Sequence, residues 1–129
     1  MVRIRPRPTD AELAILHVLW NRGASTVRQV HEALSGARDT GYTTTLKLMQ
    51  IMAEKGLVAR DESERTHVYT ARLGRDETQR QLVADLLERA FGGSAAALVM
   101  QALRAHPASD AEMAEIRRMI REHRKERGQ

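Results

Sequence analysis

The stretch GYTTTLKLMQIMAEKGLVARDESERTHVYTA, residues 41–71, decides the fold because its hydrophobic period changes partway along. From about Thr43 the apolar residues recur at helical spacing, and Gly56 is the residue type that commonly ends a helix in the left-handed conformation. The inward residues expected in this helix are Leu48, Met49 and Met52. After Gly56, β-favouring residues stand on both sides of a polar run over 61–65, so the stretch predicts a helix followed by a two-stranded hairpin.

Two shorter helices are predicted upstream of this stretch. Thr9 and Glu12 have the T-x-x-E spacing of a capping box, which begins the first helix. Ser25 or Thr26 caps the second helix, and Thr26 has the same capping-box spacing with Gln29. Three helices followed by a hairpin is the order of elements in a winged helix-turn-helix, whose third helix enters the major groove of DNA. We therefore expect residues 9–72 to form a winged-helix DNA-binding domain.

The chain beyond the hairpin returns to helical patterns. Three amphipathic segments follow, and Ser94 and Ser109 are the expected N-caps of the last two, with Ser109 and Glu112 at capping-box spacing. Because these helices have apolar faces and little else to pack on, we expect residues 73–129 to form a helical dimerisation domain. The residues expected in the dimer interface are Leu82, Leu86, Phe91, Leu98, Val99, Met113, Ile116 and Ile120.

The predicted fold class is mainly α with a small β wing: a winged helix-turn-helix domain followed by a helical dimerisation region. Residues 1–8 precede the first helix, and Pro6 and Pro8 prevent a helix there, so we expect a flexible basic arm. Its arginines are Arg3, Arg5 and Arg7. The sequence leaves two interpretations of them open, which are contacts in the minor groove and a disordered basic chain end.

Composition excludes several classes of protein. The chain has 129 residues, no cysteine and a formal net charge of +4. Without cysteine it can form no disulfide and no thiolate site, which fits a reducing compartment such as the cytoplasm. The first twenty residues lack the long apolar core of a secretory signal, and no stretch approaches the roughly 20 apolar residues that span a bilayer. We expect a cytoplasmic protein without membrane insertion.

The candidate DNA-contacting residues lie on the helix that begins near Thr43. Its polar face consists of Thr43, Thr44, Lys47 and Gln50, with Leu46 beside it. Hydroxyl groups near the start of a helix suit phosphate, lysine and glutamine can reach guanine or adenine edges, and an apolar side chain suits a thymine methyl group. The same periodicity also fits a solvated helix face, and the spacing alone does not separate the two.

The polar run of the hairpin is ambiguous in the same way. The basic residues of the hairpin are Arg60, Arg65 and His67, and its acidic residues are Asp61, Glu62 and Glu64. The basic side chains suit phosphate groups, whereas the carboxylates among them would repel the same backbone. A wing that contacts DNA and a simple turn both remain open.

No catalytic, cofactor or metal site is predicted. The five histidines have neither H-x-x-x-H spacing nor a cysteine partner, so a metal site would need ligands from distant segments. No glycine-rich phosphate loop, nucleophile elbow or carboxylate pair with a partner motif occurs. We therefore expect a chain that is not an enzyme and holds no cofactor.

Four segments together carry a resemblance to a known family. They are PTDAELAILHVLWNRGASTVRQVHEAL at 8–34, GYTTTLKLMQIMAEKGLV at 41–58, THVYTA at 66–71 and FGGSAAALV at 91–99. In this order they resemble the penicillinase-repressor family, also called BlaI/MecI/CopY. No single segment is diagnostic, but the combination is specific and covers about 9–120.

The resemblance implies a homodimer of winged helices that binds a palindromic operator and represses by occluding the promoter. It places Thr43, Thr44, Leu46 and Lys47 at the DNA-facing positions of the recognition helix, and Arg65 at a basic position of the wing. In the β-lactam-responsive members a membrane sensor-protease pathway leads to cleavage of the dimerisation part at an Asn-Phe bond. The matching stretch here, 98–102, reads LVMQA, so the resemblance leaves the cleavage site and the signal open.

Two departures from the family pattern limit what the resemblance implies. Lys47 and Ile51 stand where the family often has a small residue and an arginine, so the preferred half-site does not carry over. The C-terminal cysteines of the copper-responsive members are absent, which disfavours copper sensing. The alternative function is a winged-helix module that binds another protein and never reads DNA, and the acidic residues of the hairpin favour it.

Overall fold

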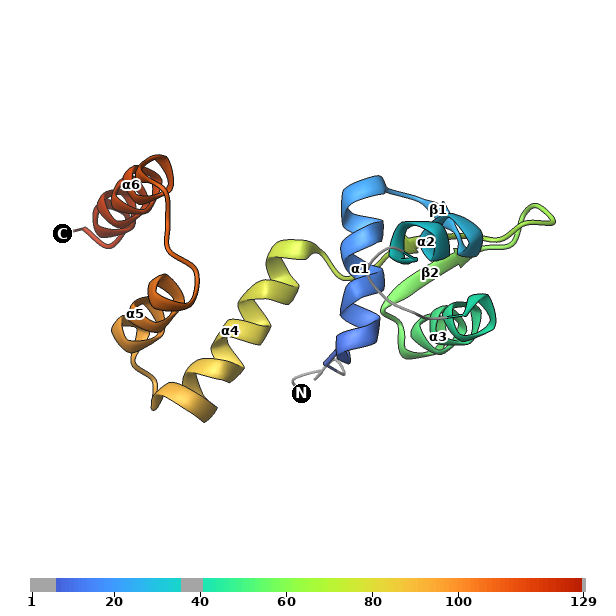
Figure 1. Ribbon diagram of the computed structural model, residues 1–129, viewed down its shortest axis with the longest axis horizontal. Helices are drawn as coiled ribbons and strands as arrows, with labels where there is room; N and C mark the ends of the chain where they lie inside the picture. Colours follow the sequence, from blue (N-terminus) through green and yellow to red (C-terminus); the bar gives the residue numbers. More distant parts are fainter. Residues whose placement is uncertain (1–6, 36–40, 129) are drawn as a thin grey trace. The chain divides into compact units, whose positions relative to one another are not determined.

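The computed structural model describes residues 7–35 and 41–128. Arg3 and Arg5 of the predicted arm lie outside these residues. The chain divides into two compact units, 1–83 and 84–129, each of which is described by itself below. The predicted fold class is confirmed, since the described residues form helices and one small antiparallel sheet (Figure 1).

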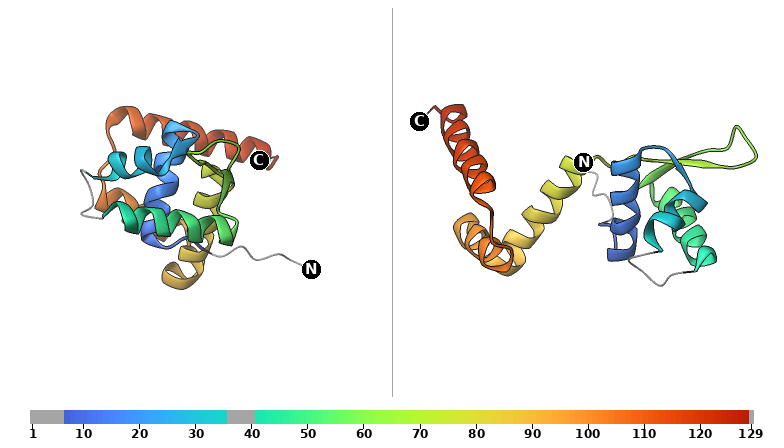
Figure 2. Two further views of the ribbon diagram at one scale, coloured as in Figure 1. Left: turned by 90° about the vertical axis from the view of Figure 1, so that its right-hand side faces the viewer. Right: turned by 45° about the horizontal axis from the view of Figure 1, so that its top comes forward.

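The first unit contains three helices and three strands. They are, in chain order, α1 (Asp10–Arg22), β1 (Ser25–Thr26), α2 (Val27–Leu34), α3 (Tyr42–Lys55), β2 (Val58–Asp61) and β3 (Val68–Ala71). The loop between β2 and β3 extends away from the three helices as a wing (Figures 1 and 2). The helix α4 (Arg75–Phe91) begins in this unit and continues into the second.

Both upstream capping boxes are confirmed. The Glu12 amide donates to Thr9 Oγ1 at 3.2 Å, and the Thr9 amide donates to Glu12 Oε1 at 2.9 Å. Thr26 and Gln29 make the same reciprocal pair at the start of α2. Because two of the free amide groups of each first turn gain a partner, α1 and α2 begin where these residues stand.

The sheet has three antiparallel strands in the order β1-β3-β2. Tyr69 of β3 pairs with Arg60 on one side and with Ser25 on the other. The sequence predicted β2 and β3 but not β1, because two residues are too few for a periodic pattern and Thr26 was interpreted only as a cap. The short strand matters because it fixes the start of α2 against the wing.

The core of the first unit lies between α1, α2, α3 and the sheet. Its buried side chains include Ile15, Leu16, Leu19, Val30, Met49, Met52, Leu57, Val58, Tyr69 and Leu73. Leu48, predicted to point inward, is half-buried at the edge of this core, whereas the polar Thr45 is fully buried. The Trp20 indole closes one end of the core by donating to the Leu73 carbonyl at 2.8 Å.

Gly56 ends α3 as the sequence predicts. Its φ is +83°, and its amide donates to the Ala53 carbonyl at 3.2 Å while the next amide, of Leu57, reaches the Met52 carbonyl at 2.9 Å. A residue with a side chain would be strained in this left-handed conformation. The turn therefore brings β2 back alongside α3 within two residues of the helix end.

The second unit consists of the rest of α4 with α5 (Ala95–Ala105) and α6 (Asp110–Glu126). Ser94 and Ser109 cap α5 and α6 by accepting from Ala97 and Glu112 amides at 3.1 Å. The predicted capping box at Ser109 is only half made, because the structure gives no return bond from the Glu112 side chain. No side chain of α5 or α6 is buried by another described part of the chain.

Among the described residues, no helix combines the length and the apolar character needed to cross a membrane.

Candidate nucleic-acid interface

The exposed face of α3 is the first part of the candidate interface. At about 100° per residue, Thr43, Lys47, Gln50 and Glu54 lie within about 60° of one another on the side opposite the buried methionines. All four are exposed, and Thr44 is exposed one step further round the helix. The predicted polar residues therefore share one exposed face of α3. This face also contains the carboxylate of Glu54, which was not predicted as part of it.

The start of α3 leaves its first amide groups available. Gly41 is the N-cap, and no side chain makes a capping hydrogen bond there. Thr45, one turn into the helix, is buried and turns its hydroxyl back towards the Gly41 carbonyl at 3.4 Å and towards His31 Nδ1 at 3.5 Å. Uncapped amide groups at a helix N-terminus carry a partial positive charge, which suits a phosphate oxygen.

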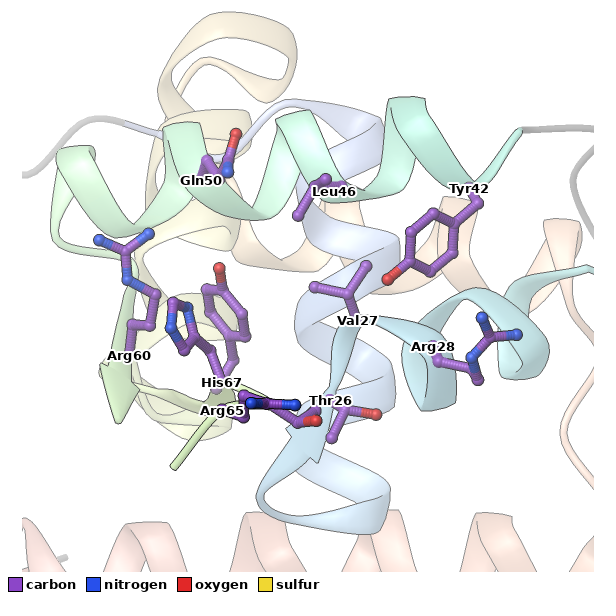
Figure 3. A pocket seen from close by; sticks show the side chains of 11 residues that line it. Thr26, Val27, Arg28, Tyr42, Leu46, Gln50, Arg60, Arg65 and His67 are labelled. Carbon is purple, nitrogen blue, oxygen red and sulfur yellow. The ribbon is translucent and has the colours of Figure 1, made fainter. Parts of the chain in front are cut away.

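A hollow of about 540 Å³ adjoins this face between α2, α3 and the wing. Its lining residues are Thr26, Val27, Arg28, Tyr42, Leu46, Gln50, Arg60, Arg65, Thr66, His67 and Tyr69. Tyr42, Leu46 and Gln50 come from α3, Arg28 from α2, and the remaining cations from the wing and its strands (Figure 3). None of the lining residues is acidic. Three guanidinium groups around one concavity make a positive potential that attracts polyanions.

Tyr42 links α2 to the start of α3. The guanidinium carbon of Arg28 lies 5.5 Å from the centre of the Tyr42 ring, a cation–π distance, and the His31 ring meets Tyr42 edge to face at 5.8 Å. These contacts hold Arg28 beside the hollow. Sequence analysis missed Arg28 and Tyr42, although the position of Arg28 in the first turn after the Thr26 cap was a usable signal.

Two of the acidic side chains in the wing are bound by neighbouring groups of the wing itself. Arg60 Nε lies 2.9 Å from Glu62 Oε1, and the Asp61 carboxylate accepts from the Ser63 amide at 2.9 Å. The Tyr69 hydroxyl and then the Glu62 charge raise the pKa of Arg60, while the Ser63 amide lowers the pKa of Asp61. Two of the three carboxylates are thus occupied within the wing, which reduces their repulsion of a phosphate backbone.

The structure brings some of the predicted residues together and leaves others apart. Leu46, Gln50 and Arg65 line the same hollow, and Leu46 is half-buried against the core. Thr43, Thr44 and Lys47 are exposed on α3 outside the hollow. The candidate interface is therefore a convex helix face beside a cationic concavity, rather than one pocket.

The position of α3 depends on an ion pair that sequence analysis also missed. Lys55 Nζ in the last turn of α3 lies 2.8 Å from Glu12 Oε2 in the first turn of α1, and the Glu12 side chain is only 2% exposed. Burial raises the pKa of Glu12, but hydrogen bonds from Lys55 and Thr9 outweigh this and lower it. Glu12 is therefore both the capping residue of α1 and the anchor of α3.

The described residues contain no group of three or more histidine, cysteine, aspartate and glutamate side chains that could hold a metal ion.

Three helices, a three-stranded sheet with a protruding hairpin and an exposed polar face on the third helix define a winged helix-turn-helix protein. The chain belongs to the penicillinase repressor family, whose sequence profile matches residues 8–122. The predicted resemblance is thus confirmed, and the chain is a DNA-binding transcriptional repressor of that family.

Individual relatives agree with this assignment. The chain is 45% identical over 93 residues to the transcriptional regulator BlaI of Mycobacterium tuberculosis, covering 70% of this chain and 67% of the relative. It is 23% identical over 119 residues to the penicillinase repressor of Bacillus licheniformis, covering 92% and 93%. The solution structure of the DNA-binding domain of the repressor BlaI has the same fold, with a TM-score of 0.51, 22% identity and coverage of 59% of this chain and 93% of that one.

A second solved structure gives the same similarity in fold. It is described as the Bacillus licheniformis BlaI monomeric form in complex with the blaP half-operator, again with a TM-score of 0.51, 22% identity and coverage of 59% and 93%.

Proposed function

We propose that this chain represses transcription by binding a palindromic operator as a homodimer, with α3 in the major groove and the wing on the flanking backbone. The half-operator complex of the relative supports an operator as the ligand. The chain carries out no reaction in this proposal. Its effect is to occupy DNA that the transcription machinery would otherwise use.

The observation that carries the proposal is the pairing of an exposed helix face with a cationic concavity. Arg28, Arg60 and Arg65 surround the hollow, and none of the side chains that line it is acidic. A sugar-phosphate backbone that follows this hollow would gain several charge-assisted contacts and release counterions. The adjacent α3 would then lie along the groove beside that backbone.

The α3 residues divide into two roles in this proposal. Lys47 and Gln50 reach base edges, because both are exposed one turn or more from the helix start and have the donors that guanine and adenine recognise. Thr43 and Thr44, next to the uncapped start of α3, contact phosphate. Leu46 lies beside a thymine methyl, and Arg65 contacts the flanking backbone.

Dimerisation is assigned to residues 73–129. Val83, Leu86, Val99, Met100, Met119 and Ile120 are exposed apolar side chains of α4, α5 and α6. Such a set is unusual on a monomer and typical of an interface that a second copy covers. The predicted interface residues Leu82, Phe91, Leu98, Met113 and Ile116 are half-buried beside them. Repression would end when proteolysis in this region separates the dimer, through a sensor-protease pathway whose cleavage site in this chain is open.

A fluorescence anisotropy titration tests the proposed function. The labelled duplex carries the DNA upstream of this protein's own gene, where the proposal places the palindrome. Unlabelled nonspecific DNA is the competitor, and the titration is run at two salt concentrations. We expect saturable binding of one dimer per palindrome, with an affinity that falls steeply as salt rises. Equal affinity for the palindrome and the nonspecific duplex would contradict the proposal and favour the protein-binding alternative.

A further inference from the structure

The surface of α6 is divided lengthwise into three sectors. An apolar stripe of Met113, Ile116 and Ile120 recurs at the a and d positions of a heptad repeat, and Ile120 is 55% exposed. Arg117, Arg121 and Arg124 follow one edge of this stripe. Glu112, Glu115, Glu122 and Glu126 follow the opposite edge, where the exposed Met119 stands among them. We call these two rows the basic flank and the acidic flank of α6.

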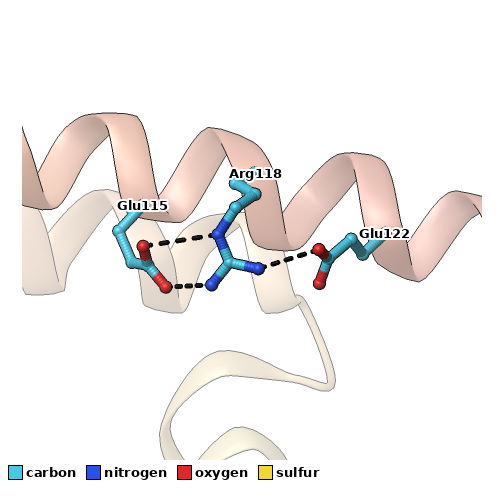
Figure 4. Close-up of polar contacts among 3 residues, drawn as sticks. All are labelled: Glu115, Arg118 and Glu122. Atoms are coloured by element: carbon cyan, nitrogen blue, oxygen red, sulfur yellow. Dashed lines mark hydrogen bonds and ion pairs between the residues drawn. The ribbon is translucent and has the colours of Figure 1, made fainter.

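The two flanks differ in how their charges are satisfied. Arg118 stands behind the acidic flank and binds both Glu115 and Glu122, with its Nη1 2.8 Å from Glu122 Oε1 (Figure 4). Glu115 thereby has a lowered pKa, caused chiefly by the Arg118 hydrogen bond. The arginines of the basic flank have no carboxylate partner anywhere in the described ranges. Two carboxylates of the acidic flank, Glu115 and Glu122, are thus bound within α6, whereas no ion pair is present among the described residues for Glu112, for Glu126 or for the basic flank.

Symmetry decides which flank of a second α6 meets the basic flank. If two α6 helices face each other through their apolar stripes and run parallel, a twofold axis along the pair brings each basic flank against the acidic flank of the other copy. If they run antiparallel, the axis is perpendicular to the helices, and each flank meets its own equivalent. The parallel arrangement therefore brings Glu112 against Arg117 of the partner subunit, with Met119 against Arg124 of the partner subunit, whereas the antiparallel arrangement brings the arginines of the two basic flanks together.

We propose that a second copy of this chain covers the apolar stripe with its own α6, parallel and in register. In this arrangement Glu112 lies at position g and pairs with Arg117 of the partner subunit at position e of the next heptad. Ile116 and Ile120 each contact their own equivalents across the axis. This inference rests on the proposed homodimer and adds its orientation, and it makes the charge pattern of α6 a determinant of which chains can pair.

Single cysteines test the orientation directly, because the natural chain contains none. Met113→Cys and Ile120→Cys are prepared as separate full-length variants and oxidised with glutathione disulfide. The two positions are about 10.5 Å apart along a helix, at 1.5 Å per residue. A disulfide needs Cα atoms within about 7 Å of each other. Only the parallel in-register pair lets each variant form its own disulfide-linked dimer.

Each result has a distinct meaning. We expect both variants to cross-link with themselves, and Ala111→Cys, on the face of α6 away from the stripe, not to do so. Cross-linking of only one variant, or only of a mixture of the two, would show antiparallel helices and overturn the proposal. Absence of any cross-link would show that the apolar stripes of two α6 helices do not face each other, which also overturns the proposal.

The same samples separate this inference from the proposed function. Reduced variants are measured for mass by analytical ultracentrifugation and for operator binding by anisotropy. A dimer that binds the operator but lacks the two self-cross-links contradicts the parallel α6 pair alone. A monomer that shows no preference for the operator contradicts the proposed function as well.

Discussion

The Glu12 carboxylate lies 2.8 Å from the Lys55 ammonium group, so the first turn of α1 is tied to the last turn of α3. Because the Glu12 side chain is 2% exposed and the Lys55 side chain 34%, the two partners are not equivalent. Lys55→Met leaves a buried carboxylate without its cation, and we expect it to lower the free energy of unfolding by about 3 kcal/mol. Glu12→Gln leaves a partly solvated lysine and keeps the capping geometry, so about 1 kcal/mol is expected.

Urea denaturation followed by circular dichroism measures both values. Glu54→Gln, one residue before Lys55 and exposed, is the matched control and should leave stability almost unchanged. Equal losses for Lys55→Met and Glu12→Gln would mean that burial of Glu12 does not determine the energetics of the pair.

The same pair predicts a pH dependence. Since folding lowers the pKa of Glu12 below its ordinary 4.5, its contribution to stability is present above that pH and is lost as pH falls through the folded-state pKa. We expect the difference in unfolding free energy between wild type and Glu12→Gln to shrink steadily below about pH 4.5. Denaturant titrations from pH 7 down to pH 3 give this difference. A constant difference over that range would exclude ionised Glu12 as its source.

Lys47 and Arg65 should affect DNA binding differently. Lys47→Ala removes a donor that reaches base edges, so we expect a loss of about 1–3 kcal/mol for the operator with a smaller loss for unrelated DNA. Arg65→Ala removes a backbone contact, so all sequences should weaken alike and the slope of log affinity against log salt should fall by about 1. Competition titrations at several salt concentrations measure both quantities. If Lys47→Ala lowered the affinity for operator and unrelated DNA equally, Lys47 would contact the DNA backbone rather than base edges.

Glu54 is the carboxylate on the exposed face of α3, next to Arg60 at a small hollow of about 350 Å³. If α3 enters the groove along its whole length, Glu54 approaches phosphate groups and weakens binding. We expect Glu54→Gln to strengthen binding to any duplex by about 0.5–1 kcal/mol at low salt, with less effect at high salt. Glu88→Gln, exposed on α4, raises the net charge by the same one unit outside the candidate interface and is the control for an overall change of charge. Weaker operator binding by Glu54→Gln would instead indicate that Glu54 accepts a hydrogen bond from a base.

Much of the fold could be predicted because its signals are local. Thr9 with Glu12, Thr26 with Gln29, and Gly56 determine helix ends by contacts within one turn, which sequence spacing reveals directly. The short strand β1 could not be predicted, because it exists only by pairing with β3, more than forty residues away in the chain. A local pattern contains no information about such a partner.

The candidate site was predictable to the same extent. The exposed face of α3 follows from helical periodicity, so Lys47 and Gln50 could be named. Tyr42 could not be named, because its relevance comes from the meeting of α2 with α3, and for Arg28 the only signal was its place in the first turn after the Thr26 cap. Glu12 was recognised as a cap, but its second role depends on Lys55, 43 residues later. Tertiary contacts of this kind supplied most of what the sequence analysis missed.

The second unit yields the last prediction, which concerns Val99 on α5. This side chain is 47% exposed in the single chain, so a charged residue is tolerated there unless a second copy covers it. We expect Val99→Asp to convert the proposed dimer into a folded monomer, because burying an unpaired carboxylate in an apolar interface is strongly unfavourable. Affinity for the full palindrome should fall by at least 10²-fold, since the second half-site loses its effective concentration. Affinity for a single half-site should stay unchanged.

Sedimentation equilibrium gives the mass, and anisotropy with full and half operators gives the two affinities. Gln101→Asp, exposed on the other side of α5, adds the same charge and should remain dimeric. If Val99→Asp stayed dimeric with full operator affinity, α5 would lie outside the interface. If it lost half-site binding as well, the substitution would have damaged the winged helix itself, which circular dichroism would report. Only a monomer that keeps half-site binding separates recognition by α3 from assembly by the C-terminal helices.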